Sequence, residues 1–278
     1  MWLLLPQPWS LPQPPAPHLL LSGSPTSCQK PLPLGLVVAA ARNTSSSPKD
    51  RCLADLVQIG LYFCLRSCEY TKTNSHRRKT QFCLRSIQFQ DSLGTVPFDV
   101  PDSHFLNALV VTLFLDKQKN DVRGESISMD NTRLPLGYPV MACARRFLHL
   151  RDHDTDLNMP MCVYFECKRA EGEYVTSTHL VARLRLWAGK IVFSRLEFHP
   201  HKISSHSLRS GSAITLYWAD QLEIIIKVIG RWRSDSLPIY LQGQVATFTK
   251  GVSVAMKQVM WFTSTARPPQ QPPSSEHG

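Results

Sequence analysis

Apolar residues recur at steps of three and four between residues 53 and 68, and this spacing predicts one amphipathic helix. Arg66 and Glu69 fall outside this stripe, on the side of the predicted helix that also carries Tyr62 and Tyr70. We therefore expect the stripe to pack against a core and Arg66 to project away from it.

Short runs rich in Phe, Ile, Val and Leu follow this helix and predict a small sheet. The first two runs are residues 81–88 and 108–115. The second is followed by Lys-Gln-Lys-Asn-Asp and then by a further run at 122–129, an order that indicates a β-hairpin.

The second half of the chain has mostly helical periodicity and capping signals. The predicted elements are a helix at 140–149, a strand at 161–166, helices that begin at Ser177 and at Ser205 or Ser207, and a helix at 222–229 that ends at Gly230. The expected fold class is α+β, mostly helical with a small antiparallel sheet.

Proline separates the ends of the chain from its body. Of the 21 prolines, ten lie in residues 1–50 and four in the last eleven residues. Residues 1–50 are also rich in Ser and Leu and carry few charges, a composition that predicts disorder. We therefore expect one domain over residues 51–266, with disordered segments at 1–50 and 267–278.

Composition narrows the range of partners and compartments. The 278 residues are 43% hydrophobic, enough for a sizeable core, and the net charge of +10 favours an anionic partner such as nucleic acid or a membrane face. No apolar run approaches the ~20 residues of a spanning helix, and the apolar start lacks a basic leader. The eight cysteines follow no regular framework, which is typical of reduced thiols in an intracellular protein.

The chemistry-bearing residues form an ordered set. Common nucleotide-binding, serine-hydrolase and zinc-protease motifs are absent from the sequence. Instead, His206 and Arg209 form a His-x-x-Arg motif, a Gly-Arg-Trp run ends at Trp232, and Tyr240 follows. With the Leu-Arg-x-x-Glu run at 65–69, this set resembles the tyrosine recombinases, whose catalytic domain is phage-integrase-like. The resemblance is greatest to those of eukaryotic mobile elements such as Cryptons and tyrosine-recombinase retrotransposons.

The resemblance extends from about residue 51 to residue 257 and implies a role for each residue of the set. The turn at 117–124 resembles the hairpin that holds the family's catalytic lysine, and Lys119 is preferred to Lys117 because it abuts the turn. The implied roles are Arg66 and Arg209 as the two catalytic arginines, Lys119 as general acid, His206 as base or oxyanion donor, Trp232 at the His-or-Trp position, and Tyr240 as nucleophile.

These residue types suit phosphodiester cleavage. The phosphate gains negative charge as phosphorus becomes pentacoordinate, and the planar guanidinium of arginine donates paired hydrogen bonds while staying charged. Tyrosine has a pKa of ~10, so Tyr240 needs a base or a strongly cationic site. Lys119 can protonate the leaving 5′-oxygen. The phosphotyrosyl ester conserves the energy of the broken bond, so neither nucleotide, metal nor another cofactor is expected.

The resemblance also implies double-stranded DNA as the partner, a homo-oligomer on DNA, and a nuclear location if the protein is eukaryotic, without a membrane role. Basic residues near the set predict DNA contacts, since phosphates bind Lys and Arg. They are Arg77, Arg78, Lys79, Arg231 and Arg233. For the first three, a charged loop between helix and strand explains the same residues.

Two alternatives stay open. Pro238 lies two residues before Tyr240, where it would kink a helix. The helical core-binding domain that precedes the family's catalytic domain is also not recognisable in residues 1–50. Both features suit a catalytically decayed or domesticated remnant that binds DNA without cutting it. A metal-dependent phosphohydrolase that uses His149, His153 and Asp154 is the weaker alternative.

Overall fold

The computed structural model describes residues 30–42, 47–72, 81–115, 125–131, 139–153, 156–168, 171–191, 198–219 and 221–232. Its helices are α1 (Leu34–Arg42), α2 (Pro48–Tyr62), α3 (Ser67–Tyr70), α4 (Asp102–Leu106), α5 (Pro139–Arg151), α6 (Ser177–Ile191), α7 (Ser207–Trp218) and α8 (Glu223–Gly230). Its strands are β1 (Ile87–Asp91), β2 (Gly94–Thr95), β3 (Val110–Leu115), β4 (Glu125–Asp130), β5 (Val163–Tyr164) and β6 (Glu173–Tyr174). The predicted fold class, mostly helical with a small antiparallel sheet, is confirmed.

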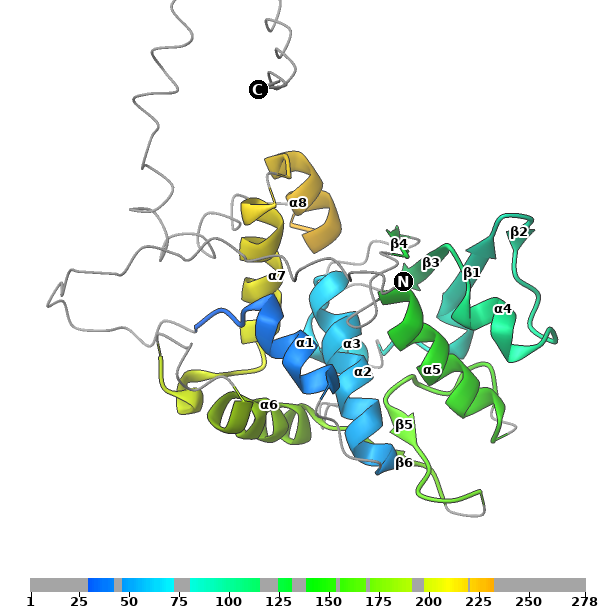
Figure 1. The fold of residues 1–278 in the computed structure, drawn as a ribbon, viewed down its shortest axis with the longest axis horizontal. Helices are drawn as coiled ribbons and strands as arrows, with labels where there is room; N and C mark the ends of the chain where they lie inside the picture. Colours follow the sequence, from blue (N-terminus) through cyan, green and yellow to red (C-terminus); the bar gives the residue numbers. More distant parts are fainter. Residues whose placement is uncertain are drawn as a thin grey trace, which may run out of the picture.

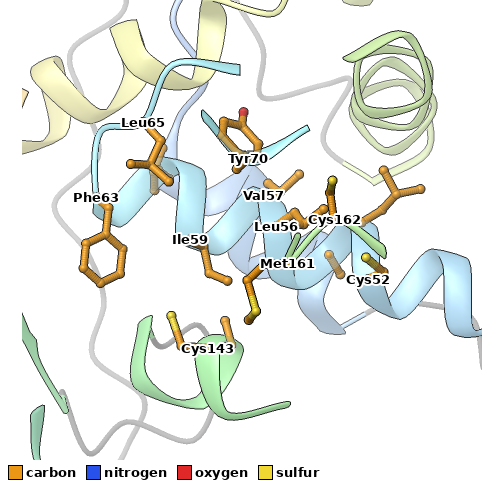
Figure 2. Packing of buried hydrophobic residues seen from close by; sticks show 14 of the residues in the cluster. Cys52, Leu56, Val57, Ile59, Phe63, Leu65, Tyr70, Cys143, Met161 and Cys162 are labelled. Atoms are coloured by element: carbon orange, nitrogen blue, oxygen red, sulfur yellow. The ribbon is translucent and has the colours of Figure 1, made fainter. Parts of the chain in front are cut away.

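Helix α2 lies at the centre of the molecule. Figure 1 shows α5 and the sheet on one side of it and α1, α6 and α7 on the other. Its residues are buried without interruption from Cys52 to Leu61, so the helix packs on all sides rather than along one stripe. In Figure 2, Ile59 points from α2 toward Cys143 of α5, with Met161 nearby.

The sheet has the strand order β2-β1-β3-β4, and every pair in it is antiparallel. Strands β3 and β4 pair from Val110–Asp130 to Leu115–Glu125, which confirms the predicted hairpin. One face of the sheet packs on α4 and α5 through Phe89, whose ring contacts Phe105 and Phe147 edge-on at 5.5 and 5.4 Å. The turn that joins β3 to β4 lies outside the described residues.

The disorder predicted for residues 1–50 is wrong for part of that range. Residues 34–42 form α1, and four apolar side chains at 32, 36, 37 and 40 are almost fully buried. The backbone N–H of Leu32 also donates to the Ser207 carbonyl at 3.0 Å. The apolar residues in this part of the segment are spaced so that they lie on one face of a helix, and burial of that face stabilises the helix. The low charge of the whole segment does not prevent this. The packed part of the chain therefore begins before residue 51.

The first helix also ends earlier than its apolar stripe predicts. Helix α2 stops at Tyr62, and Cys64 then adopts a left-handed backbone conformation with φ of 49°. Arg66 is extended and precedes α3 as its N-cap. Arg66 therefore lies on a turn after the helix, not on the face of the helix that the spacing predicted.

In the second half of the chain, α5 and α6 confirm the predicted helices, α7 begins at Ser207, and α8 ends at Gly230. The predicted strand at 161–166 is reduced to β5, which pairs with β6. None of the helices in the described ranges is both long and apolar enough to cross a bilayer.

Candidate functional site

Three stretches of chain that are distant in sequence meet at the end of α2. They are the turn from Cys64 to Glu69, the first turns of α7, and residues 229–232, which are the last two residues of α8 and the two that follow it. Three of the predicted catalytic residues, Arg66, Arg209 and Trp232, lie in these stretches. The structure thus brings three of the predicted residues into one region of the molecule.

Arg66 is held by the first turn of α3. Its backbone N–H donates to Oε2 of Glu69 at 2.7 Å, and its side-chain Nη1 donates to Oε1 at 3.1 Å. The side chain of Glu69 is 6% exposed and that of Arg66 is 24% exposed. Arg66 is therefore held at its backbone and at its guanidinium by a buried carboxylate, while part of its side chain reaches the surface.

Arg209 ties the three stretches together from inside α7. Its Nη1 donates to the Cys64 carbonyl at 2.6 Å, and its Nη2 donates to the carbonyl of Gly230. The guanidinium also lies over the ring of Trp232, 4.7 Å from the ring centroid, a cation–π contact. Arg209 is buried, so in this structure it supplies positive charge from within and not from the surface.

Trp232 is packed against the end of α8. A Cβ atom on Gly230 would lie 2.0 Å from Cζ3 of the Trp232 ring, much closer than any real contact. Glycine is required here by the close approach of the indole. The sequence predicted that the helix ends at Gly230; glycine is the usual left-handed residue after a helix, but here Arg231 has that conformation, with φ of 53°.

Arg231 is placed in the interior, whereas the sequence predicted it as a DNA contact. Its Nη2 donates to Oε2 of Glu69 at 2.7 Å, and its side chain is only 2% exposed. Burial lowers the pKa of Arg231, and the neighbouring Arg209 acts in the same direction while Glu69 opposes it. The guanidiniums of Arg66, Arg209 and Arg231 and the carboxylate of Glu69 form a cationic cluster. Its net charge is +2, which favours the binding of an anion.

His206 precedes α7 as its N-cap residue and lies at the surface. Its carbonyl accepts from the backbone N–H of Ser210 at 3.0 Å and from the Ser210 hydroxyl at 3.2 Å. The three-residue spacing of His206 and Arg209 would place both side chains on one face of a helix. The structure separates them by exposure, because Arg209 turns into the core.

The remaining predicted site residues lie outside the described residues. They are Lys117, Lys119 and Tyr240, the expected DNA contacts Arg77, Arg78, Lys79 and Arg233, and also Pro238. The catalytic roles assigned to the set stay predictions.

The histidines of the alternative metal site have packing roles. Nε2 of His149 accepts from the Phe165 backbone N–H at 3.1 Å, and the ring of His153 stacks on that of Phe165 at 4.4 Å. Burial lowers the pKa of His149 to about 3, and the charge of Arg146 adds to this effect. Within the described ranges, no group of three or more His, Cys, Asp or Glu side chains could hold a metal.

Sequence reasoning missed the pairing of Arg231 with Glu69. Glu69 was recognised as part of the Leu-Arg-x-x-Glu run but received no role. The available signal was a basic residue between Gly230 and Trp232, a position that must be tightly packed if Trp232 reaches the site. That signal cannot reveal whether the side chain points inward or outward.

The structure is similar to solved structures of recombinases and of an integrase. XerH bound to palindromic difH substrate, in a post-cleavage complex, matches with a TM-score of 0.51 at 15% identity, over 82% of this chain and 54% of XerH. The Tn1549 transposon integrase in complex with transposon right end DNA matches with a TM-score of 0.42 at 11% identity, over 83% and 66% of the two chains. An Flp recombinase–Holliday junction complex matches with a TM-score of 0.40 at 14% identity, over 74% and 44%.

The similarity to XerH shows the fold: the chain has the fold of a tyrosine-recombinase catalytic domain. It spans about half the length of the XerH chain, 54%. No protein-family model matches the chain. No curated protein matches it in sequence.

Proposed function

We propose that this chain is a DNA strand transferase that cuts and rejoins double-stranded DNA through a 3′-phosphotyrosyl intermediate at Tyr240. The observation that carries the proposal is the cationic cluster in a recombinase fold, in which Arg209 lies over Trp232 and Arg66 shares the Glu69 carboxylate with Arg231. A net charge of +2 around one partly exposed arginine side chain suits the developing charge of a scissile phosphate.

The proposed reaction uses the predicted set as follows. Arg66, with its exposed surface, binds a non-bridging oxygen, and Arg209 adds positive charge from beneath. The Tyr240 oxygen attacks phosphorus, and His206 accepts its proton or supports the oxyanion. The bond to the 5′-oxygen breaks, Lys119 protonates that oxygen, and the reverse sequence rejoins the strand.

A second candidate function is supported by the burial of Arg209. Two of its N–H groups donate to the carbonyls of Cys64 and Gly230, so they are engaged in holding the protein together. A remnant of a mobile element, which binds DNA without cutting it, would keep this arrangement and still be basic. Its affinity for DNA would come from phosphate contacts.

The finer assignments belong to the same proposal. We propose double-stranded DNA as the partner, an origin among the tyrosine recombinases of eukaryotic mobile elements, a homo-oligomer on DNA, and a nuclear location. Gel filtration of the protein with and without duplex tests the oligomer. An elution volume that corresponds to one protein monomer bound to the duplex would contradict it.

The decisive experiment incubates the full chain with a nicked suicide duplex, from which the cleaved end diffuses away. A covalent protein–DNA adduct on a denaturing gel is expected for the wild type and not for Tyr240→Phe. Retardation of DNA without an adduct would select the binding remnant. The absence of both the adduct and the retardation would refute both functions. An adduct that persists in Tyr240→Phe would show that another residue is the nucleophile.

The same assay tests Arg66. Arg66→Ala is expected to slow adduct formation by about 100-fold to 1,000-fold, the usual loss for one preorganised donor at a developing negative charge. Exposed Arg85 offers a matched control, because Arg85→Ala removes the same charge from the surface elsewhere. Equal effects of the two substitutions would contradict a special role for Arg66.

A further inference from the structure

Glu69 is shared by two arginines, only one of which belongs to the predicted catalytic set. Its Oε1 accepts from Nη1 of Arg66, while its Oε2 accepts both from the backbone N–H of Arg66 and from Nη2 of Arg231. The side chains of Glu69 and Arg231 are 6% and 2% exposed, against 24% for Arg66. The Glu69 carboxylate thus joins the buried Arg231 to Arg66, which lies at the edge of the cluster and is partly exposed to solvent.

The surroundings of Arg231 are unfavourable for a residue with a purely structural role. Its backbone is in the left-handed region, and its buried Nε has no hydrogen-bond partner among the described residues. Nη1 lies at 3.4 Å from the carbonyls of Phe63 and Ile229, which makes for long hydrogen bonds. Left-handed non-glycine backbone, an unsatisfied buried donor and a buried charge each reduce stability.

We propose that Arg231 is a positioning residue that neutralises part of the Glu69 charge, so that Glu69 can orient Arg66 without occupying it fully. Arg66 then keeps positive charge for an anion at the rim. That this anion is a scissile phosphate rests on the proposed function, whereas the sharing of Glu69 does not.

Charge balance explains why a second cation is needed. With Arg231 present, the cluster of three guanidiniums and Glu69 has a net charge of +2; without it, the net charge is +1. Arg209 already donates to Cys64 and Gly230, so Arg66 would become the main partner of a buried carboxylate. A lone ion pair of this kind in the interior is tight, because the surrounding dielectric is low. Arg66 would be drawn toward Glu69 and away from an incoming anion.

The first test measures the reactivity of Arg66 toward phenylglyoxal, an arginine-specific reagent, by mass spectrometry of the full chain without DNA. Arg231→Met is expected to slow modification of Arg66 by about tenfold, a typical coupling between contacting groups. Arg231→Lys, which keeps the charge, is expected to react almost as the wild type does. The double variant Glu69→Gln, Arg231→Met is expected to recover most of the rate, because the charge that holds Arg66 is gone.

The pattern separates positioning from structure. If Arg231 has a merely structural role, Arg66 is modified no faster in the double variant than in Arg231→Met, and that result would overturn the proposal. An Arg66 reactivity in Arg231→Met equal to that of the wild type would also overturn it. The buried Arg209 is the internal control, since it stays unmodified in any folded variant. If Arg231→Met does not fold, Glu69→Gln alone decides: faster modification of Arg66 supports the proposal, and an unchanged or slower rate overturns it.

The second test repeats the variants in the suicide-duplex assay, where adduct rates are expected to follow the same order. If the wild type forms no adduct but the order of Arg66 reactivity holds, the proposed function fails and the positioning role stands. If adducts form but their rates and the Arg66 reactivity ignore Arg231, the positioning role fails and the proposed function stands.

Discussion

At the scale of single residues, the site depends on how closely Gly230 approaches Trp232. Gly230 is the last residue of α8, and a Cβ atom on it would lie 2.0 Å from the indole ring. The indole in turn carries the guanidinium of Arg209 on its face. A single methyl group at this position would therefore disturb the ring and the arginine together.

Gly230→Ala is accordingly expected to lower the free energy of unfolding by about 1–3 kcal/mol, the usual cost of forcing extra volume into a packed region. Urea denaturation measures it. Gly189→Ala in α6 is the matched control: no atom of the described residues lies within 4 Å of its new Cβ, and alanine favours a helix by about 0.5–1 kcal/mol. Equal stabilities of the two variants would show that the indole can move aside at little cost.

At the scale of elements, α1 is an integral part of the fold. Leu36 and Val37 are buried against the core, and Leu32 pairs with the carbonyl of Ser207 at the start of α7. A Cβ on Gly211 would lie 2.1 Å from the Leu32 carbonyl oxygen, so α7 and the segment before α1 touch backbone to backbone. The segment that leads into α1 thus supports the helix that carries Arg209.

Leu36→Ala is expected to destabilise the chain by about 2–5 kcal/mol, because Leu36 is fully buried and its loss leaves a cavity. Thermal unfolding followed by circular dichroism measures the effect. Gly35→Ala is the control, since its new Cβ meets no atom within 4 Å in the part of the chain that the structure describes. A melting temperature of Leu36→Ala equal to that of the wild type would mean that α1 does not pack on the core in solution.

How well the sequence predicted each element follows from how local its signal was. The β3–β4 hairpin and α5 to α8 have strong periodicity or caps and were predicted within a few residues. Helix α1 was missed because charge and proline were averaged over 50 residues, which hid four well-spaced apolar positions. The end of α2 was missed because its apolar stripe continues through Cys64, whose left-handed turn has neither glycine nor proline to mark it.

At the scale of the whole molecule, the convergence of residues 64–69, α7 and residues 229–232 is a tertiary property. The order of Arg66, Arg209 and Trp232 predicted it only through resemblance to a family, and the hydrogen bonds of Arg209 now join those stretches. The inward turn of Arg231 could not be predicted, because it depends on a carboxylate 162 positions away in sequence.

The global stability is expected to depend on pH through His149. Its pKa is lowered to about 3 in the folded chain from 6.5, so below pH 6.5 the unfolded chain binds a proton that the folded chain does not. Stability therefore falls as pH decreases from 6.5 toward 3. In His149→Gln, which can still accept from Phe165, the decrease measured by urea denaturation is expected to be smaller. Exposed His179→Gln serves as control, and an unchanged pH profile in His149→Gln would contradict the assignment.

The net charge of +10 makes a prediction for the whole surface. Binding to duplex DNA releases counterions, so the logarithm of the association constant is expected to fall linearly with the logarithm of salt concentration. Fluorescence anisotropy with a labelled duplex measures the slope. Arg66→Ala is expected to reduce the slope by about 1, as the loss of one phosphate contact does. Arg231→Met is expected to reduce the slope by no more than Arg66→Ala does, because the Arg231 charge is buried and acts on DNA only through Arg66. A slope near zero for the wild type would mean that the basic surface does not bind the DNA backbone.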